Sequence, residues 1–280
     1  MRYALLFLTL FATRLYGQEI CYTPTDSAKI YNMLAQLEKS RNKKSAQLLV
    51  DAGTMLLGTP YVAGTLDREK DEKLTINISE VDCTTFVEQS LALAMTVTQG
   101  KKDFRTFCNN LRTLRYRGGS IRSYSDRLHY FSQWVKEGEK NGILKEQSGK
   151  AFSSRQNLSL FFMSKNPDKY MQLKENSTLT ANIATHEIPF RNITIPYLPK
   201  EKLNNGPKQL PIRNGDIIAL VTTIKGLDVT HMGIAYWKKG KLHLMHASYK
   251  EKRVIIDTLS LHDYLAPRKS TPGIRVVRVK

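Results

Sequence analysis

Two kinds of hydrophobic spacing divide the chain. In the first half, apolar residues recur at the three- and four-residue intervals of an amphipathic helix. This spacing predicts helices within 27–57, over about 83–97 and over 103–114. Short apolar or alternating segments near the end predict strands at 216–221, 232–237, 242–247, 253–257 and 274–279. Helices first and an antiparallel sheet last predict an α+β fold.

Capping and turn residues refine this picture. Asp82 or Ser79 is expected to cap the helix that begins at about Cys83. The pair Lys239-Gly240 lies between two predicted strands and indicates a hairpin. Residues 141–206 are mostly polar, with short apolar patches. We expect this segment to be an insertion that covers the core and shapes a cleft.

The amino terminus carries the pattern of a secretory signal peptide. Arg2 precedes a short apolar stretch over 4–12, and Gly17 offers a small residue for cleavage. The stretch is too short to span a bilayer, which needs about 20 apolar residues. The sequence therefore predicts a signal peptide at 1–17, an exported, periplasmic protein and a single catalytic domain over 18–280. No other segment is apolar enough for a membrane span.

Charge narrows the choice of partners. The 280 residues include 43 Lys and Arg against 25 Asp and Glu, a formal net charge of +18. A strong positive potential favours nucleic acid, an anionic membrane surface or carboxylate-bearing cell-wall fragments. The basic residues are scattered, and the chain has neither zinc-finger spacing nor an RNA-binding aromatic signature, so nucleic acid is disfavoured.

The cysteine count draws attention to one thiol. An exported chain with three cysteines leaves at least one unpaired. Cys21 and Cys108 could form a disulfide, which would leave Cys83 free. An unpaired thiol in an oxidising compartment calls for a chemical role, although an inert buried cysteine is the alternative.

Cys83 and two histidines form the candidate catalytic group. A thiol attacks as the thiolate, and a helix amino terminus and a nearby imidazolium would both lower its pKa from about 8.5. Strand alternation places His231, Gly233 and Ala235 on one face, and His246 on the same side of the next strand. The small residues predict that the cysteine helix lies over this face. His231 would then accept the thiol proton while His246 orients it.

Other chemistries fit these residues less well. Cys83 with two histidines could hold zinc, but no closely spaced ligand pair and no second cysteine lie nearby. The chain has no G-x-S-x-G motif for a serine nucleophile. The residues alone therefore predict a cysteine hydrolase whose substrate stays open.

Four motifs in order resemble the NlpC-type, papain-like cell-wall peptidases: LGTPYVAGT (57–65), VDCTTFVE (81–88), THMGIAY (230–236) and HAS (246–248). The double threonine after Cys83, together with RYRGG (115–119) and DRLHYFSQW (126–134), is similar to their N-acetylmuramoyl-L-alanine amidase-like branch. The resemblance implies an NlpC-type, papain-like fold with the nucleophile helix packed on a carboxyl-terminal antiparallel sheet.

By the same resemblance, Cys83 is the nucleophile, His231 the base and later acid, and His246 the third member. Tyr61 would place its hydroxyl near the reacting centre and, with the Cys83 N–H, stabilise the oxyanion. The implied reaction hydrolyses the amide between N-acetylmuramic acid and L-Ala of the stem peptide, without metal or cofactor. Peptidoglycan or muropeptide fragments are the expected partners. The candidate substrate contacts are Arg115, Arg117, Arg127, His129 and Tyr130.

Alternatives stay open at this point. The basic candidates could equally form a structural or solvated face. An endopeptidase that cuts between γ-D-Glu and the diamino acid would use the same triad. A non-catalytic wall-binding protein or a thiol acyl transferase would be a different class.

Overall fold

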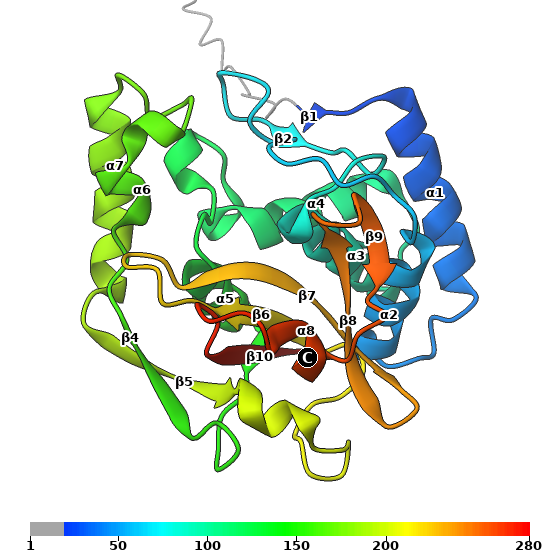
Figure 1. Cartoon of the computed structure of the whole chain (residues 1–280). Helices are drawn as coiled ribbons and strands as arrows, with labels where there is room; N and C mark the ends of the chain where they lie inside the picture. The colour runs from blue at the N-terminus through cyan, green and yellow to red at the C-terminus, as the bar shows by residue number, and fades with distance from the viewer. Residues whose placement is uncertain (1–19) are drawn as a thin grey trace, which may run out of the picture.

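A group of helices lies against a long antiparallel sheet (Figure 1). The structure, a computed structural model, describes residues 20–280, so the signal peptide predicted at 1–17 lies outside the described part. The predicted combination of helices and an antiparallel sheet is present, whereas the NlpC-type, papain-like class stays a prediction. Within residues 20–280, no helix combines the length and apolar character that crossing a membrane requires.

The longer helices of the first half are α1 (Pro24–Glu38), α2 (Ser45–Met55), α3 (Cys83–Thr98), α4 (Phe104–Arg115) and α5 (Phe131–Lys140). Side-chain caps set three of their starts, with Thr23 before α1, Asp82 before α3 and Asp103 before α4. The three predicted helical regions are confirmed. α5 falls outside them, because polar residues occupy several of its buried positions.

All five predicted strands are present, as β6 (Ile217–Val221), β7 (Val229–Lys238), β8 (Lys241–Ser248), β9 (Arg253–Ile256) and β10 (Gly273–Val279). The sheet has the order β4-β5-β10-β6-β7-β8-β9, and β3 pairs with β10. Its neighbouring strands are antiparallel. Lys239 and Gly240 both have positive φ, as a two-residue hairpin between β7 and β8 requires, so the predicted turn is confirmed.

The segment 141–206 does more than cover the core. It contains β3 (Leu144–Glu146), β4 (Ser154–Leu158), β5 (Ile193–Pro199), α6 (Phe162–Lys165) and α7 (Ser177–Glu187). β4 and β5 extend one edge of the sheet, while α6 and α7 stand apart from α1 and α2 on the opposite side of the molecule (Figure 1). We call α6, α7 and the residues between them the insertion lobe.

The remaining elements are short. They are β1 (Ile20–Cys21), β2 (Leu74–Thr75), α8 (Leu261–Leu265) and the 3-10 helices at Arg117–Gly119, Tyr124–Asp126, Pro167–Lys169, Ile188–Phe190 and Lys200–Asn204. β1 and β2 pair in parallel outside the main sheet.

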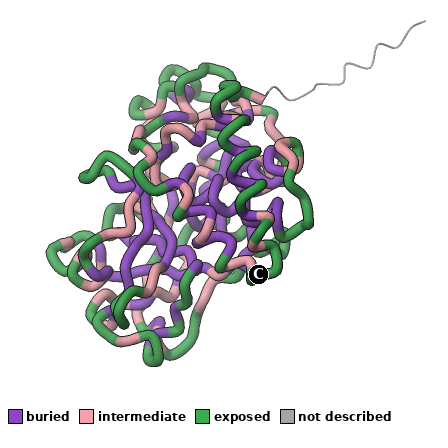
Figure 2. Tube along the Cα trace, turned by 90° about the vertical axis from the view of Figure 1, so that its right-hand side faces the viewer, coloured by how far each residue is buried: buried purple, intermediate pink, exposed green. Residues whose placement is uncertain are grey.

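Buried residues fill the middle of the molecule (Figure 2). Most residues of α3 are buried. The helices pack on the sheet face that carries Met232, Ile234 and Met245. The prediction that the cysteine helix covers the face of Gly233 was therefore wrong. Gly233 is small for another reason, since a Cβ there would lie 2.7 Å from the Met245 carbonyl oxygen of β8. The glycine that admits a helix is Gly53 in α2, where a Cβ would lie 2.9 Å from Met245 Sδ.

Candidate active site

Cys83 is the first residue of α3, and Asp82 fixes that position. The Thr85 N–H donates to Asp82 Oδ1 at 2.8 Å, and the Asp82 N–H donates to Thr85 Oγ1 at 2.9 Å. This reciprocal pair satisfies backbone donors that the first turn would otherwise leave free. Of the two predicted caps, Asp82 is therefore the one used, whereas the Ser79 hydroxyl donates to Asp26.

Burial governs the Cys83 thiol. It raises the pKa of Cys83 to about 12, and the charge of Asp82 acts in the same direction. Hydrogen bonds to the sulfur lower its pKa and so oppose this shift; they come from the Met232 N–H, the Thr84 hydroxyl and the Thr84 N–H. Thr84 Oγ1 lies 4.0 Å from Sγ. The expected lowering by the helix terminus is therefore outweighed, and the resting thiol is neutral.

Changing Asp82 to asparagine is expected to lower the pKa of Cys83 without removing the helix cap. Asparagine caps a helix about as well as aspartate, but it lacks the charge that raises the thiol pKa. Alkylation of Cys83 by iodoacetamide, followed by peptide mass spectrometry against pH, should show a midpoint at lower pH. Asp103→Asn, at the corresponding cap of α4, is the matched control. An unshifted midpoint in Asp82→Asn would contradict this account.

His231 and His246 meet across neighbouring strands, on one side of the sheet as predicted. His231 Nε2 lies 2.7 Å from His246 Nδ1, and the two rings are nearly perpendicular at 84°. Burial lowers the pKa of His231 to about 3, and the charges of His246 and Arg268 add to the effect. His231 is therefore a neutral imidazole, which can accept a proton.

Asp257 extends this pair to a row of three. His246 Nε2 lies 3.4 Å from Asp257 Oδ2. Although burial opposes it, the hydrogen bonds from His246 and from the Leu259 N–H lower the pKa of Asp257. An ionised Asp257 accepts from His246 Nε2–H, so His246 Nδ1 accepts from His231 Nε2–H. This tautomer leaves the lone pair of His231 Nδ1 for the thiol proton.

The sequence analysis missed Asp257. A signal was available, because this carboxylate ends the predicted strand 253–257. The sequence could not show the register of β8 against β9. In that register His246 pairs with Ile255, which brings the His246 ring near the end of β9.

The structure brings Cys83 and His231 to one small cavity of about 130 Å³, which His129 and Tyr130 also line. Tyr61 lies near the same centre. Burial raises the pKa of Tyr61 to about 12, and the charge of Cys83 contributes next. The Tyr61 N–H donates to the Lys252 carbonyl at 2.9 Å, which joins its loop to the turn before β9.

The predicted substrate contacts separate into two groups. Arg115 is buried, and its Nε donates to Glu88 Oε2 at 2.7 Å. Arg127 is buried as well and bridges Asp67 and Glu72 at 2.7 and 3.0 Å. These contacts favour the structural alternative for both arginines. Tyr130 donates to the buried Glu187 at 2.7 Å, so its hydroxyl is also engaged inside the protein. Arg117 is half-buried, and burial lowers its pKa.

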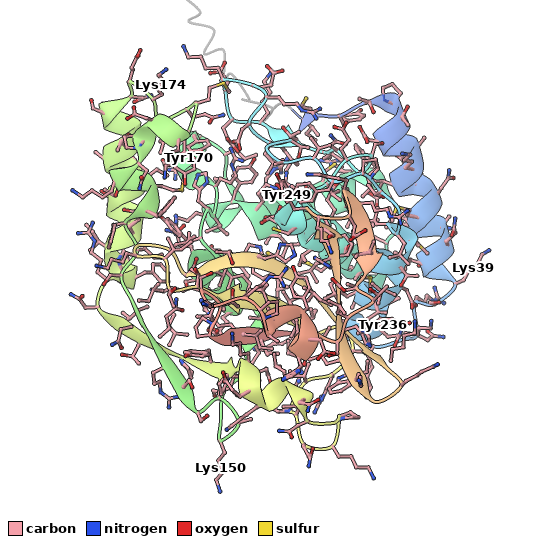
Figure 3. All side chains as sticks on the ribbon, viewed as in Figure 1. Lys39, Lys150, Tyr170, Lys174, Tyr236 and Tyr249 are labelled. Atoms are coloured by element: carbon pink, nitrogen blue, oxygen red, sulfur yellow. The ribbon has the colours of Figure 1, made fainter. Side chains whose placement is uncertain are left out.

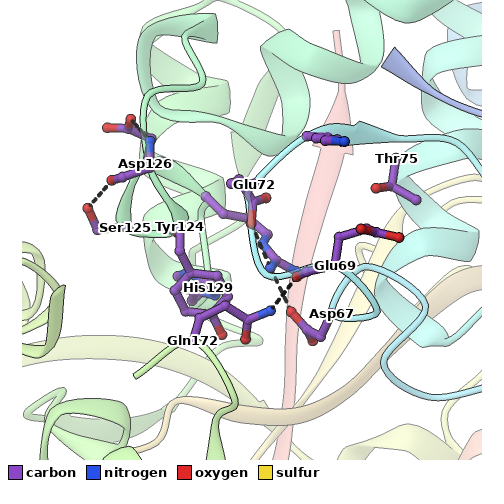
Figure 4. Close-up of polar contacts among 12 residues, drawn as sticks. Asp67, Glu69, Glu72, Thr75, Tyr124, Ser125, Asp126, His129 and Gln172 are labelled. Carbon is purple, nitrogen blue, oxygen red and sulfur yellow. Dashed lines mark hydrogen bonds and ion pairs between the residues drawn. The ribbon is translucent and has the colours of Figure 1, made fainter. Parts of the chain in front are cut away.

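His129, like Tyr130, lines the cavity that holds Cys83 and His231. Its Nε2 lies 2.8 Å from the Tyr124 carbonyl oxygen, and its ring packs on the Tyr124 ring at 4.3 Å (Figure 4). Burial lowers the pKa of His129 to about 3. His129 therefore lines the cavity as a neutral ring, and a role in substrate binding stays a prediction.

The three cysteines are free thiols in the described part of the chain. Cys21 is exposed in β1, whereas Cys108 is buried in α4. The disulfide considered between them is thus not formed in this structure.

A family model described as AmiA-like, N-acetylmuramoyl-L-alanine amidase-like, matches residues 51–274. With this cysteine and histidine geometry on an α+β fold, the chain belongs to that family. A crystal structure of an N-acetylmuramoyl-L-alanine amidase from Bacteroides uniformis is 38% identical with a TM-score of 0.80, and the match covers 85% of this chain and 100% of that chain. No curated protein matches the sequence.

Two further solved structures are similar. The crystal structure of a Bacteroides fragilis protein that is named as a candidate xylanase is 45% identical to this chain. The match covers 81% of this chain and 99% of that chain, with a TM-score of 0.75. Protein LPG0564 from Legionella pneumophila is 22% identical over 91% of this chain and 94% of that chain, with a TM-score of 0.68. The Legionella structure supports the fold alone.

Proposed function

We propose that this protein is a peptidoglycan amidase that hydrolyses the bond between N-acetylmuramic acid and L-Ala of the stem peptide, with Cys83 as nucleophile. The observation that carries the proposal is the row Asp257–His246–His231, which leaves a proton acceptor at the cavity that holds Cys83. The family description and the name of the Bacteroides uniformis structure support the amide bond as the target.

The first half of the reaction transfers an acyl group to sulfur. Cys83 Sγ attacks the lactyl carbonyl carbon of the muramic acid as His231 Nδ1 takes the thiol proton. The Cys83 backbone N–H and the Tyr61 hydroxyl would donate to the oxyanion, since the raised pKa keeps Tyr61 protonated. The His231 imidazolium then protonates the L-Ala nitrogen. The C–N bond breaks, the stem peptide leaves and a thioester remains.

Water completes the cycle. His231, neutral again, takes a proton from water as its oxygen attacks the thioester carbonyl. The C–S bond breaks and the imidazolium returns the proton to the sulfur, which regenerates the thiol. The products are the muramic acid carboxylate and a stem peptide with a free amino group on L-Ala. Cys83 and His231 are both neutral at rest, so the thiol proton passes to His231 as the sulfur attacks. In the second half, a proton passes from water to His231 as the water oxygen attacks.

A glycosidase fits this cavity less well. Cleavage between sugars by the usual mechanism needs two carboxyl groups across the scissile bond. Among the described residues that line the Cys83 cavity, Asp228 is the sole carboxylate. It is buried and accepts the Ser132 N–H at 2.6 Å. The cavity therefore favours thiol chemistry.

The order of Tyr61, Cys83, His231 and His246 along the chain and the packing of α3 on the sheet support the NlpC-type, papain-like class. We also propose that the protein acts after export and removal of residues 1–17. Amino-terminal sequencing of protein from the producing cell tests the cleavage site.

Mass spectrometry of defined muropeptides incubated with the mature protein tests the reaction. Release of a free stem peptide that begins at L-Ala supports the amidase. Release of an L-Ala-γ-D-Glu dipeptide would overturn the bond assignment and identify an endopeptidase. No cleavage of a broad panel by folded protein would overturn the catalytic proposal and favour wall binding.

Replacing Asp257 by asparagine is expected to lower kcat by about 10²-fold or more with a small change in KM. The asparagine amide can donate to His246 Nε2, which reverses the tautomer and removes the acceptor for His231 Nε2–H. Asp263→Asn is the matched control, because Asp263 also pairs with a histidine, His262, but lies on the surface. Steady-state kinetics and thermal unfolding of both variants check this. An equal loss of kcat in the two variants would count against the positioning role.

A further inference from the structure

A second hollow in the described part of the chain is separate from the Cys83 cavity. It has a volume of about 960 Å³ and lies between the loop 70–73, the segment 121–124 and residues 171–179 of the insertion lobe. We call it the lobe cleft. The Cys83 cavity, at about 130 Å³, is too small for a sugar and a peptide together. Most of a muropeptide must therefore lie outside that cavity, and the lobe cleft has the size of a ligand site, about 300–1,000 Å³.

A pair of touching rings, tilted by 43°, lies between the two hollows. Tyr124 lines the lobe cleft, and its ring lies 4.3 Å from the ring of His129, which lines the Cys83 cavity. The two hollows are therefore neighbours, with this pair of rings between them.

Buried contacts hold both walls of the cleft in place. Arg127 binds Asp67 and Glu72 and so fixes the loop that forms one wall (Figure 4). Gln172 from the insertion lobe donates to the Glu69 carbonyl at 3.3 Å, which joins the two walls. Its Oε1 is buried and has no hydrogen-bond partner in residues 20–280. An amide N–H of a bound peptide would supply that partner.

Charges of both signs line the cleft. Lys70 and Lys174 are exposed there and form no ion pair within the described residues. Asp71 and Glu175 place carboxylates on the same two walls. N-acetylated sugar rings carry no charge, whereas a stem peptide carries several carboxylates and, on its diamino acid, an amine. Charge complementarity therefore selects the peptide rather than the glycan.

We propose that the lobe cleft binds the stem peptide, the leaving group of the reaction, with Lys70 and Lys174 pairing its carboxylates. The inference rests on the proposed amidase function and deepens it. The insertion lobe thereby becomes a specificity element, because the cleft exists only where residues 171–179 face the loop 70–73.

Comparing a short with a long substrate tests the inference. The substrates are N-acetylmuramoyl-L-Ala and the same sugar with a stem that includes D-Glu and the diamino acid. For the double variant Lys70→Ala/Lys174→Ala, the ratio of kcat/KM for the long over the short substrate should fall about tenfold. Lys39→Ala/Lys150→Ala removes two lysines that lie far from Lys174 (Figure 3) and should keep the wild-type ratio. An unchanged ratio in the cleft variant would overturn the proposal.

Binding without turnover separates this proposal from the proposed function. Calorimetric titration of Cys83→Ala protein with the free tripeptide L-Ala-γ-D-Glu-diamino acid should give saturable binding that the cleft variant weakens. Binding of the tripeptide with no cleavage by the wild type keeps the cleft and refutes the amidase. Cleavage with no tripeptide binding keeps the amidase and refutes the cleft. Tighter binding of the uncharged disaccharide, weakened by the same variant, would assign the cleft to the glycan and also refute the proposal.

Discussion

Replacing Cys83 by alanine is expected to lower kcat for a muropeptide by about 10⁴-fold or more. In the proposed reaction, this substitution removes the atom that attacks the carbonyl and forms the thioester. Cys83 is half-buried, and its nearest side-chain polar contact, Thr84 Oγ1, is 4.0 Å away, so the free energy of unfolding should change by less than about 1 kcal/mol. Product release and urea unfolding are the two measurements.

The other cysteines provide the controls for this variant. Cys21→Ala removes an exposed thiol and should leave both activity and stability unchanged. Cys108→Ala creates a small cavity in the core and should lower stability while the folded protein stays active. Retention of activity in Cys83→Ala, or its equal loss in Cys21→Ala, would show that Cys83 is not the nucleophile.

Breaking the buried pair Arg115–Glu88 is expected to give the largest loss of stability. Arg115 and Glu88 are 1% and 2% exposed as side chains, and Glu88 belongs to the helix that begins at Cys83. Arg115→Met leaves the Glu88 charge buried without a partner, which should cost about 3–5 kcal/mol. Replacing both residues, as Arg115→Met/Glu88→Leu, should recover much of that loss. Urea unfolding of the wild type and these variants gives the free energies.

The loss in Arg115→Met should depend on pH. Burial raises the pKa of Glu88 even beside Arg115, and removal of the guanidinium raises it further. A carboxyl whose pKa is higher in the folded than in the unfolded protein binds its proton more tightly when folded. The variant should therefore become less stable as pH rises above the unfolded pKa of Glu88. A loss below about 1 kcal/mol, or one independent of pH, would contradict the buried-charge account.

The sequence predicted the elements that carry their own apolar pattern. The helices α1 to α4 and the strands β6, β7, β8 and β10 each bury several side chains, and β9 buries Val254. β4 and β5 could not be predicted, because β4 is largely polar and β5 contains two prolines. These two strands join the sheet through backbone pairing with each other and with β10. Such pairing depends on register, which leaves no trace in composition.

The candidate site was predictable to the extent that its residues lie next to local signals. Cys83 follows a helix cap, and His231 and His246 alternate with apolar neighbours along predicted strands. The roles of Arg115 and Arg127 could not be read in this way. Their carboxylate partners lie 27 to 60 residues away in the chain, so only the fold shows that these charges are internal.

The burial that keeps Cys83 neutral has a consequence for oxidative damage. Peroxide and disulfides react with thiolates, and a thiol whose pKa is raised to about 12 offers almost none near neutral pH. Sulfenic acid formation and mixed disulfides should thereby be slowed at Cys83. If Cys83 is the proposed nucleophile, the desolvation that delays proton transfer until attack also protects the protein between encounters with its substrate.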